Sequence, residues 1–269
     1  MLRRYGVFLT VLLCLNATAA GAVDTRLPAG TVALEAPVLL RCGPVDQYHL
    51  RQSTKLKVAG QPEQEISLVE MAGSVVAEGG DLRNEAYYVE YDGVTRTQLG
   101  PFLLDMLYSD IGEPLSVEVR ELEEGTMNMP QPGSVDYKNF VNRIEVAMAL
   151  VALPIEAVGM GDVVYDLGPL FQNAFGAEQS QSVRIVSSDL VSTLAGEAEI
   201  DGRRYAIAQH GGSVVFEMNG MQMRAKGSGY WAIDRENCNA GDGILRLLIT
   251  LTQNDDQPIM VLESTMESD

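Results

Sequence analysis

The sequence predicts a mainly β fold of the α+β class: a curved antiparallel sheet, or incomplete barrel, packed on one central amphipathic helix. Three observations predict it. Apolar and polar residues alternate along several short segments, as they do in strands with one buried face. Residues with turn chemistry separate those segments. One segment near the middle instead repeats apolar residues at intervals of three and four.

The chain begins with the layout of a secretory signal peptide. Two arginines precede the apolar run 7–15, and small residues follow it. This predicts a leader over residues 1–22, with cleavage after Ala19 or Ala22. The apolar run is about half of the ~20 residues that cross a bilayer. We therefore expect a periplasmic or secreted protein without a transmembrane segment.

Two cysteines, Cys42 and Cys238, remain after leader removal. An exported chain enters an oxidising compartment, so one disulfide between them is expected. The bond would enclose 238 − 42 = 196 residues. A loop of that length corresponds to roughly 4–5 kcal/mol of stabilisation in the chain-entropy model. Two separate buried thiols are the alternative.

Strands are expected on both sides of the centre. Clear alternation occurs at 56–58, 87–91, 117–120 and 245–251. Turn residues that tolerate positive φ separate the strands, as hairpins require: Gly79-Gly80-Asp81, Asp92-Gly93, Asp201-Gly202, Gly211-Gly212 and Asn219-Gly220. A meander of consecutive hairpin strands is predicted, at 197–200, 203–209, 213–218 and 221–226.

The central helix is predicted over 135–153, with Ser134 as its N-cap and Pro154 preventing its continuation. Its apolar stripe consists of Tyr137, Phe140, Val141, Ile144, Met148 and Val151. A shorter helix is predicted over Pro101–Tyr108, because proline suits a first helical turn. The composition of residues 125–133 indicates a linker or an exposed loop. We expect a single domain over 23–269, with a division into two domains at this linker as the alternative.

Charge and motifs argue against several classes of function. The chain has 37 acidic and 19 basic residues, a net charge of −18, which disfavours binding to nucleic acid. Its two histidines, His49 and His210, form no metal motif, so no metal site is predicted. Neither a serine-nucleophile elbow nor a phosphate-binding loop is present. We expect a non-enzymatic protein without a cofactor, in which Gly227-Ser228-Gly229 provides a bend and His210 lies in a turn.

Two segments carry a family resemblance: Leu153-Pro154-Ile155-Glu156-Ala157-Val158-Gly159-Met160-Gly161-Asp162 and Gly227-Ser228-Gly229-Tyr230-Trp231-Ala232-Ile233-Asp234. With the signal peptide and the strand-rich first half, they resemble a group of uncharacterised bacterial secreted proteins. Val163-Val164 stands where that group commonly has a tryptophan. The group is similar in architecture to periplasmic lipoprotein carriers. That resemblance implies an incomplete barrel that covers a helix and holds acyl chains on its concave face.

The residues expected to line that face combine aromatic, aliphatic and methionine side chains: Tyr87, Val89, Tyr91, Phe140, Ile144, Met148, Phe216, Met218, Met221 and Met223. They form either a dry core or an adaptable hydrophobic pocket. The leading hypothesis is an exported, non-enzymatic envelope protein whose partner is a hydrophobic ligand or an envelope protein such as a lipoprotein. A structural or protein-interaction module is one alternative. A hydrolase using dispersed carboxylates is another.

Overall fold

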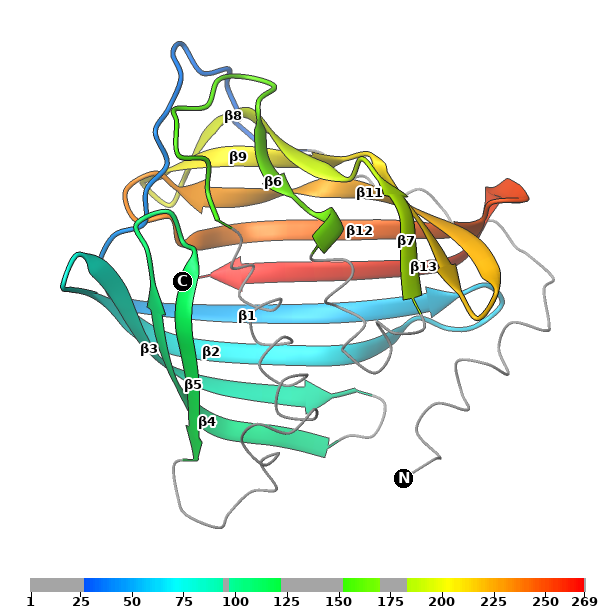
Figure 1. The fold of residues 1–269 in the computed structure, drawn as a ribbon, viewed down its shortest axis with the longest axis horizontal. Helices are drawn as coiled ribbons and strands as arrows, with labels where there is room; N and C mark the ends of the chain where they lie inside the picture. Colours follow the sequence, from blue (N-terminus) through cyan, green and yellow to red (C-terminus); the bar gives the residue numbers. More distant parts are fainter. Residues whose placement is uncertain (1–26, 94–96, 122–151, 170–182, 269) are drawn as a thin grey trace.

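The computed structural model describes residues 27–93, 97–121, 152–169 and 183–268 (Figure 1). These residues form one open antiparallel sheet of thirteen strands. The strands are β1 (Val45–Val58), β2 (Gln64–Glu78), β3 (Asp81–Asp92), β4 (Thr97–Tyr108), β5 (Pro114–Glu121), β6 (Val163–Asp166), β7 (Val183–Ser188), β8 (Val191–Ile200), β9 (Arg203–Gly211), β10 (Ser213–Met218), β11 (Met221–Asp234), β12 (Ala240–Leu251) and β13 (Asn254–Ser268).

The order of the strands brings the first and the last strand together. It runs β5-β4-β3-β2-β1-β13-β12-β11-β9-β8-β6, so β1 pairs with β13 near the middle of the sheet (Figure 1). The first five strands form a meander, as the alternation predicted. The turns at Asp201-Gly202 and Asn219-Gly220 are also confirmed, since all four residues have positive φ. The expected curved antiparallel sheet is therefore present, and it does not close into a barrel within the described residues.

The hairpin predicted at Gly211-Gly212 is wrong. β9 and β10 do not pair with each other; both pair with β11, β10 along 221–226 and β9 along 229–234. Gly212 has a φ of +90°, and a Cβ there would collide with the backbone oxygen of Asp189. The glycine pair therefore bends the chain out of one strand and into the next. β11 switches partners beside it, at the predicted bend Gly227-Ser228-Gly229.

The short helix predicted at Pro101–Tyr108 is also wrong, because this segment lies within β4. The buried side chains have period two: Phe102, Leu104 and Met106 face the core. β4 pairs with both β3 and β5, and these ladders outweigh a local preference of proline for a first helical turn. The predicted helix 135–153 lies outside the described residues except for its last two positions, which are not helical. Within the described residues, no helix combines the length and apolar content needed to cross a bilayer.

One face of the sheet, which we call the inner face, carries the two larger apolar clusters. A smaller cluster on the opposite face of β8, β9 and β11 consists of Ala198, Tyr205, Ile207 and Ala232. One row across the inner face consists of Leu50, Met71, Tyr88 and Phe102, which are paired in register on β1 to β4 and are all buried. A second row joins Ala225, Ile249, Met260 and Val58 on β11, β12, β13 and β1. Strands far apart in the sheet, such as β4 and β10, contribute to the same core cluster. The inner face is therefore the concave one.

The opposite, outer face is mostly polar and carries ion pairs between strands. Arg83 on β3 donates to Asp105 on β4 at 2.5 and 2.8 Å, and Arg120 on β5 reaches the same carboxylate at 2.9 Å. The guanidinium of Arg83 lowers the pKa of Asp105. Arg224 on β11 pairs with Asp255 on β13 at 2.5 Å. Exposed pairs of this kind contribute little each, so the apolar inner face supplies most of the stabilisation.

The disulfide between Cys42 and Cys238 is confirmed, with a Cα–Cα distance of 4.5 Å. It links the segment before β1 to the loop between β11 and β12. The backbone N–H of Cys42 donates to Asp110 O at 2.7 Å, which fixes the same segment to the β4–β5 connection. A disulfide of this span fits an extracytoplasmic protein.

Candidate functional site

The inner face contains two apolar clusters that meet at Tyr48 and Trp231. One cluster lies on β1 to β5 and β13 and includes Tyr88 and Phe102. The other extends from β2 to β13 and includes Phe216. Tyr48 and Trp231 pack against both clusters. The junction therefore marks the middle of the apolar face.

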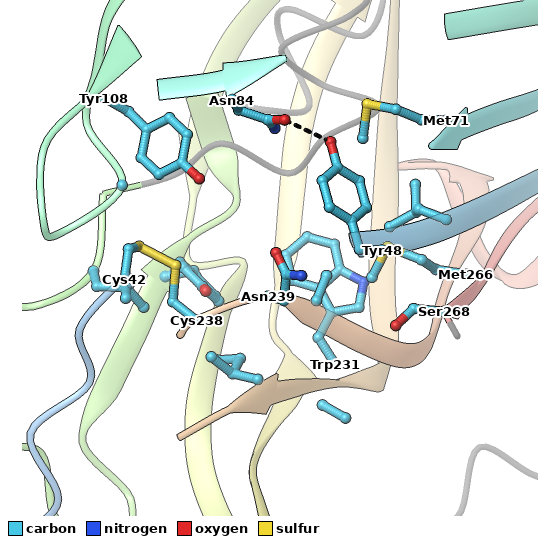
Figure 2. A pocket seen from close by; sticks show the side chains of 17 residues that line it. Cys42, Tyr48, Met71, Asn84, Tyr108, Trp231, Cys238, Asn239, Met266 and Ser268 are labelled. Carbon is cyan, nitrogen blue, oxygen red and sulfur yellow. Dashed lines mark hydrogen bonds between the residues drawn. A yellow bond between two sulfur atoms is a disulfide. The ribbon is translucent and has the colours of Figure 1, made fainter. Parts of the chain in front are cut away.

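A pocket of about 80 Å³ lies at this junction (Figure 2). Its walls include the disulfide, three tyrosines, the single tryptophan and several aliphatic or methionine side chains. It is lined by Cys42, Tyr48, Leu50, Met71, Asn84, Tyr108, Gly112, Leu153, Tyr165, Trp231, Ala232, Ile233, Cys238, Asn239, Ala240, Met266 and Ser268. An apolar cavity that admits benzene has a volume of about 150 Å³. In this conformation the pocket therefore accommodates a few waters or a small polar group, and not an acyl chain.

The polar side chains of the pocket are neutral. Tyr48 donates its hydroxyl to Oδ1 of Asn84 at 2.9 Å, and burial raises the pKa of Tyr48 to about 12 despite that hydrogen bond. Burial also raises the pKa values of Tyr108 and Tyr165. All three phenols stay protonated near neutral pH. Among the described lining residues, none carries an acidic or basic side chain.

A buried histidine lies beside this junction. The Nδ1 atom of His210 on β9 lies 2.7 Å from the hydroxyl of Ser192 on β8. Its ring stands edge-to-face against Trp231, with centroids 4.6 Å apart. Trp231 makes a second edge contact with Tyr165, at 5.7 Å. His210 therefore lies within a strand and not in the predicted turn, and its ring helps to hold Trp231 in place.

This serine–histidine pair has the wrong surroundings for nucleophilic catalysis. Ser192 is fully buried and His210 is only 4% exposed, so no substrate reaches them in this conformation. Nε2 of His210 is buried and has no hydrogen-bond partner of good geometry among the described residues. Burial lowers the pKa of His210 to about 3, against a smaller opposing effect of the Tyr230 backbone. The ring is therefore neutral at physiological pH and no carboxylate orients it, unlike the base of a catalytic triad.

A second, open groove of about 670 Å³ lies on the outer face over β1 to β4. Small residues, Ala72 and Gly73, line it together with the exposed side chains of His49 and Tyr87. The groove follows a bulge in β1 between Val45 and Tyr48. Within the part of the chain that the structure describes, no group of three or more metal-ligating side chains comes together here or elsewhere.

The structure separates the residues that were expected to line one ligand face. Phe216, Met218, Met221 and Met223 share the inner face, with Phe216 and Met223 fully buried. Tyr87, Val89 and Tyr91 alternate with the buried Tyr88 and therefore lie on the outer face, where Tyr87 is 53% exposed. Phe140, Ile144 and Met148 lie outside the described residues.

Sequence reasoning predicted the disulfide that borders the junction pocket but not the pocket itself. Tyr108 was assigned to a helix, and Tyr48 and Asn84 carry no motif. One signal was available: Asn239 and Ala240 directly follow Cys238, so the expected disulfide already placed them near Cys42.

Comparison with known proteins gives only distant similarity. No family model matches the chain, and no curated protein matches it. Among solved structures, DynF from the dynemicin biosynthesis pathway of Micromonospora chersina is 11% identical, with 94% of this chain and 95% of that chain covered and a TM-score of 0.21. A LolA superfamily protein from Nitrosomonas europaea is 9% identical, with 85% and 86% covered and a TM-score of 0.19.

A DUF1329 family protein from Desulfovibrio piger is 8% identical, with 83% of this chain and 84% of that chain covered and a TM-score of 0.17. At these identities and TM-scores, the three structures assign neither a fold family nor a function to this chain. The similarity to the LolA superfamily protein is therefore weak.

Proposed function

We propose that this chain is an exported, non-enzymatic envelope protein, folded as one domain over 23–269, that holds the acyl chain of a lipid or lipoprotein against its inner face. The observation that carries the proposal is the pair of apolar clusters, bridged by Tyr48 and Trp231, on the concave side of an open sheet. A curved apolar surface of this kind is suited to a long, flexible hydrocarbon.

The inner face is also deformable. The five buried methionines among the described residues, Met71, Met106, Met223, Met260 and Met266, all belong to its two clusters. Methionine side chains are unbranched and repack readily around irregular ligands. Because the junction pocket holds only about 80 Å³, an acyl chain has to enter by separating side chains that now touch. Methionines lower the cost of that rearrangement.

The free energy available is sufficient. Each buried methylene contributes about 0.8 kcal/mol, so a chain of about sixteen carbons gains roughly 12 kcal/mol from burial alone. Association costs several kcal/mol and displacing packed side chains costs more. Micromolar binding corresponds to about 8 kcal/mol, and the remainder is smaller than that, so we expect micromolar or weaker affinity.

Lipid content and acyl-chain affinity together test the proposal. Full-length protein expressed with export to a bacterial envelope would be analysed by native mass spectrometry and lipid extraction, then titrated with a fluorescent C16 fatty acid. We expect a bound acyl lipid and saturable binding at one site. Leu262→Asn, on the inner face, should weaken binding, whereas Leu103→Asn, on the outer face, should leave it unchanged; both positions are half-buried. Absence of copurified lipid together with absence of saturable binding contradicts acyl-chain binding.

The smallness of the junction pocket favours a second candidate, a structural or protein-interaction module whose inner face is simply its core. In that case the outer groove beside Tyr87 is the available surface. A folded protein that fails both lipid measurements would support this candidate.

A further inference from the structure

Several polar groups that line the junction pocket have hydrogen-bonding capacity that the described residues do not use. Asn84 is 3% exposed, and its Oδ1 atom accepts a hydrogen bond from Tyr48. Within the described residues, its amide nitrogen has no hydrogen-bond partner, and neither does the hydroxyl of Tyr108. Figure 2 shows the Tyr108 hydroxyl pointing toward the pocket that Asn84 borders.

The opposite wall of the pocket contains two more polar side chains that do not hydrogen-bond to the described residues. The indole N–H of Trp231 and the side-chain amide of Asn239 line the same pocket without a hydrogen-bond partner in the described part of the chain. A polar group in an apolar environment is costly unless it is hydrogen-bonded. These groups face the pocket and make no hydrogen bond to the described residues, so a water molecule or a polar group of a ligand can complete their hydrogen bonds there.

The pocket's chemistry restricts that occupant. Its described lining offers neutral N–H and O–H groups among apolar side chains, with no charged residue. An ionised carboxylate or phosphate would lose its hydration without gaining a cation. An ester or amide carbonyl is a strong acceptor with little desolvation cost by comparison, and a small group of this kind matches a pocket of about 80 Å³.

We infer that the junction pocket binds the uncharged ester or amide group of an acylated ligand, with Asn84 and Tyr108 as hydrogen-bond donors. The inference rests on the proposed function, because it places the acyl chain on the adjoining inner face. The pocket lies where the two apolar clusters meet, so a carbonyl bound there leaves its chain free to run along either cluster. The protein then selects neutral acyl esters or amides over free fatty acids.

Two probes with the same C18 chain test this selection: monoolein, which is an uncharged ester, and oleate at pH 9, where the carboxylate is ionised. Both would be titrated below their aggregation concentrations into the full-length exported protein. We expect monoolein to bind at least about tenfold more tightly. Tyr108→Phe and Asn84→Leu should each weaken monoolein by about two- to tenfold, the value of one neutral hydrogen bond, and should change oleate by less than about twofold.

Tyr205→Phe is the matched control, since Tyr205 is also a buried tyrosine but does not line the pocket. Tyr108→Phe keeps the ring and its packing, so it tests the hydroxyl even if Asn84→Leu fails to fold. Equal affinity for the two probes, or monoolein binding that ignores both substitutions, overturns the inference while the proposed function stands; it would mean that water alone fills the pocket. If neither probe binds, the proposed function itself fails.

Discussion

Tyr87 and Tyr88 are adjacent in β3, yet Tyr87 is 53% exposed on the outer face and Tyr88 is 1% exposed on the inner face. The same contrast extends along the sheet. The inner face buries aromatic, aliphatic and methionine side chains, whereas the outer face carries pairs such as Arg83–Asp105 and Arg224–Asp255. Residue type alone therefore does not tell which face a side chain occupies; the strand register does.

The comparison also separates two kinds of stabilisation. Inner-face side chains lose hydration and gain close packing, so truncation there leaves a cavity. Outer-face ion pairs remain in contact with water and contribute less. The largest effects of substitution are therefore expected on the inner side of the sheet, and they can be ranked.

The largest expected loss follows removal of the disulfide, which lies on the inner side. A Cys42→Ala/Cys238→Ala double variant should lose about 4–5 kcal/mol of unfolding free energy, because the unfolded chain regains the entropy of a loop of 196 residues. Urea denaturation of the oxidised parent and the variant measures the difference. A loss below about 1 kcal/mol would show that loop closure contributes little to this fold.

The neighbouring tyrosines give the sharpest contrast between the faces. Tyr88→Ala should cost about 3–5 kcal/mol, as expected for a buried aromatic side chain, whereas Tyr87→Ala should cost less than about 1 kcal/mol. Denaturant midpoints of both variants test this. Equal losses would contradict the assignment of the two faces.

The kink between β9 and β10 provides a second neighbouring pair. Gly212→Ala should destabilise by roughly 2 kcal/mol, because Gly212 has positive φ and no space for a Cβ beside Asp189. Gly211→Ala should be nearly neutral, since nothing lies within 4 Å of its added Cβ. Thermal melting compares the two variants. An unchanged melting temperature in Gly212→Ala would show that the bend between β9 and β10 does not require glycine.

The lowered pKa of His210 predicts that the stability of the fold depends on pH. This pKa is about 3 in the folded protein and near 6.5 when unfolded, so between these values the unfolded chain binds a proton that the folded chain does not. Stability should therefore fall as pH drops below 6.5, by about 2–3 kcal/mol at pH 4.5. His210→Gln should flatten this decline, whereas His49→Gln, at an exposed position, should not. If stability declines equally at low pH in His210→Gln, titration of other groups causes the decline.

Many elements of the fold follow from local sequence signals and could be predicted from the sequence. Alternation in 87–91 and 245–251 marks strands, and Asp201-Gly202 and Asn219-Gly220 mark turns, because these signals reflect neighbouring residues. Two cysteines remaining after the predicted leader were enough to predict their bond. The segment Pro101–Tyr108 was misassigned because apolar residues fill both of its alternating sets, and only pairing with β3 and β5 decides between them.

The candidate site was less predictable because it depends on contacts between distant strands. Tyr87 and Tyr91 were favoured as ligand contacts for their aromatic rings, but the alternate set that contains Ala86, Tyr88 and Glu90 is the buried one. The pocket combines Asn84 with Tyr108 and Trp231 from separate strands. No spacing in the sequence brings those three together before the register of the sheet is known.

Photo-crosslinking tests the central claim most directly. Full-length protein would be irradiated with a monoacylglycerol that carries a diazirine near the end of its acyl chain, and the labelled residues would be mapped by mass spectrometry. We expect labels on inner-face residues such as Met71, Met266 and Leu247, with competition by unlabelled monoolein. Labels concentrated at Tyr87 and Tyr91 on the outer face, or no labels that monoolein displaces, would contradict binding of an acyl chain on the inner face.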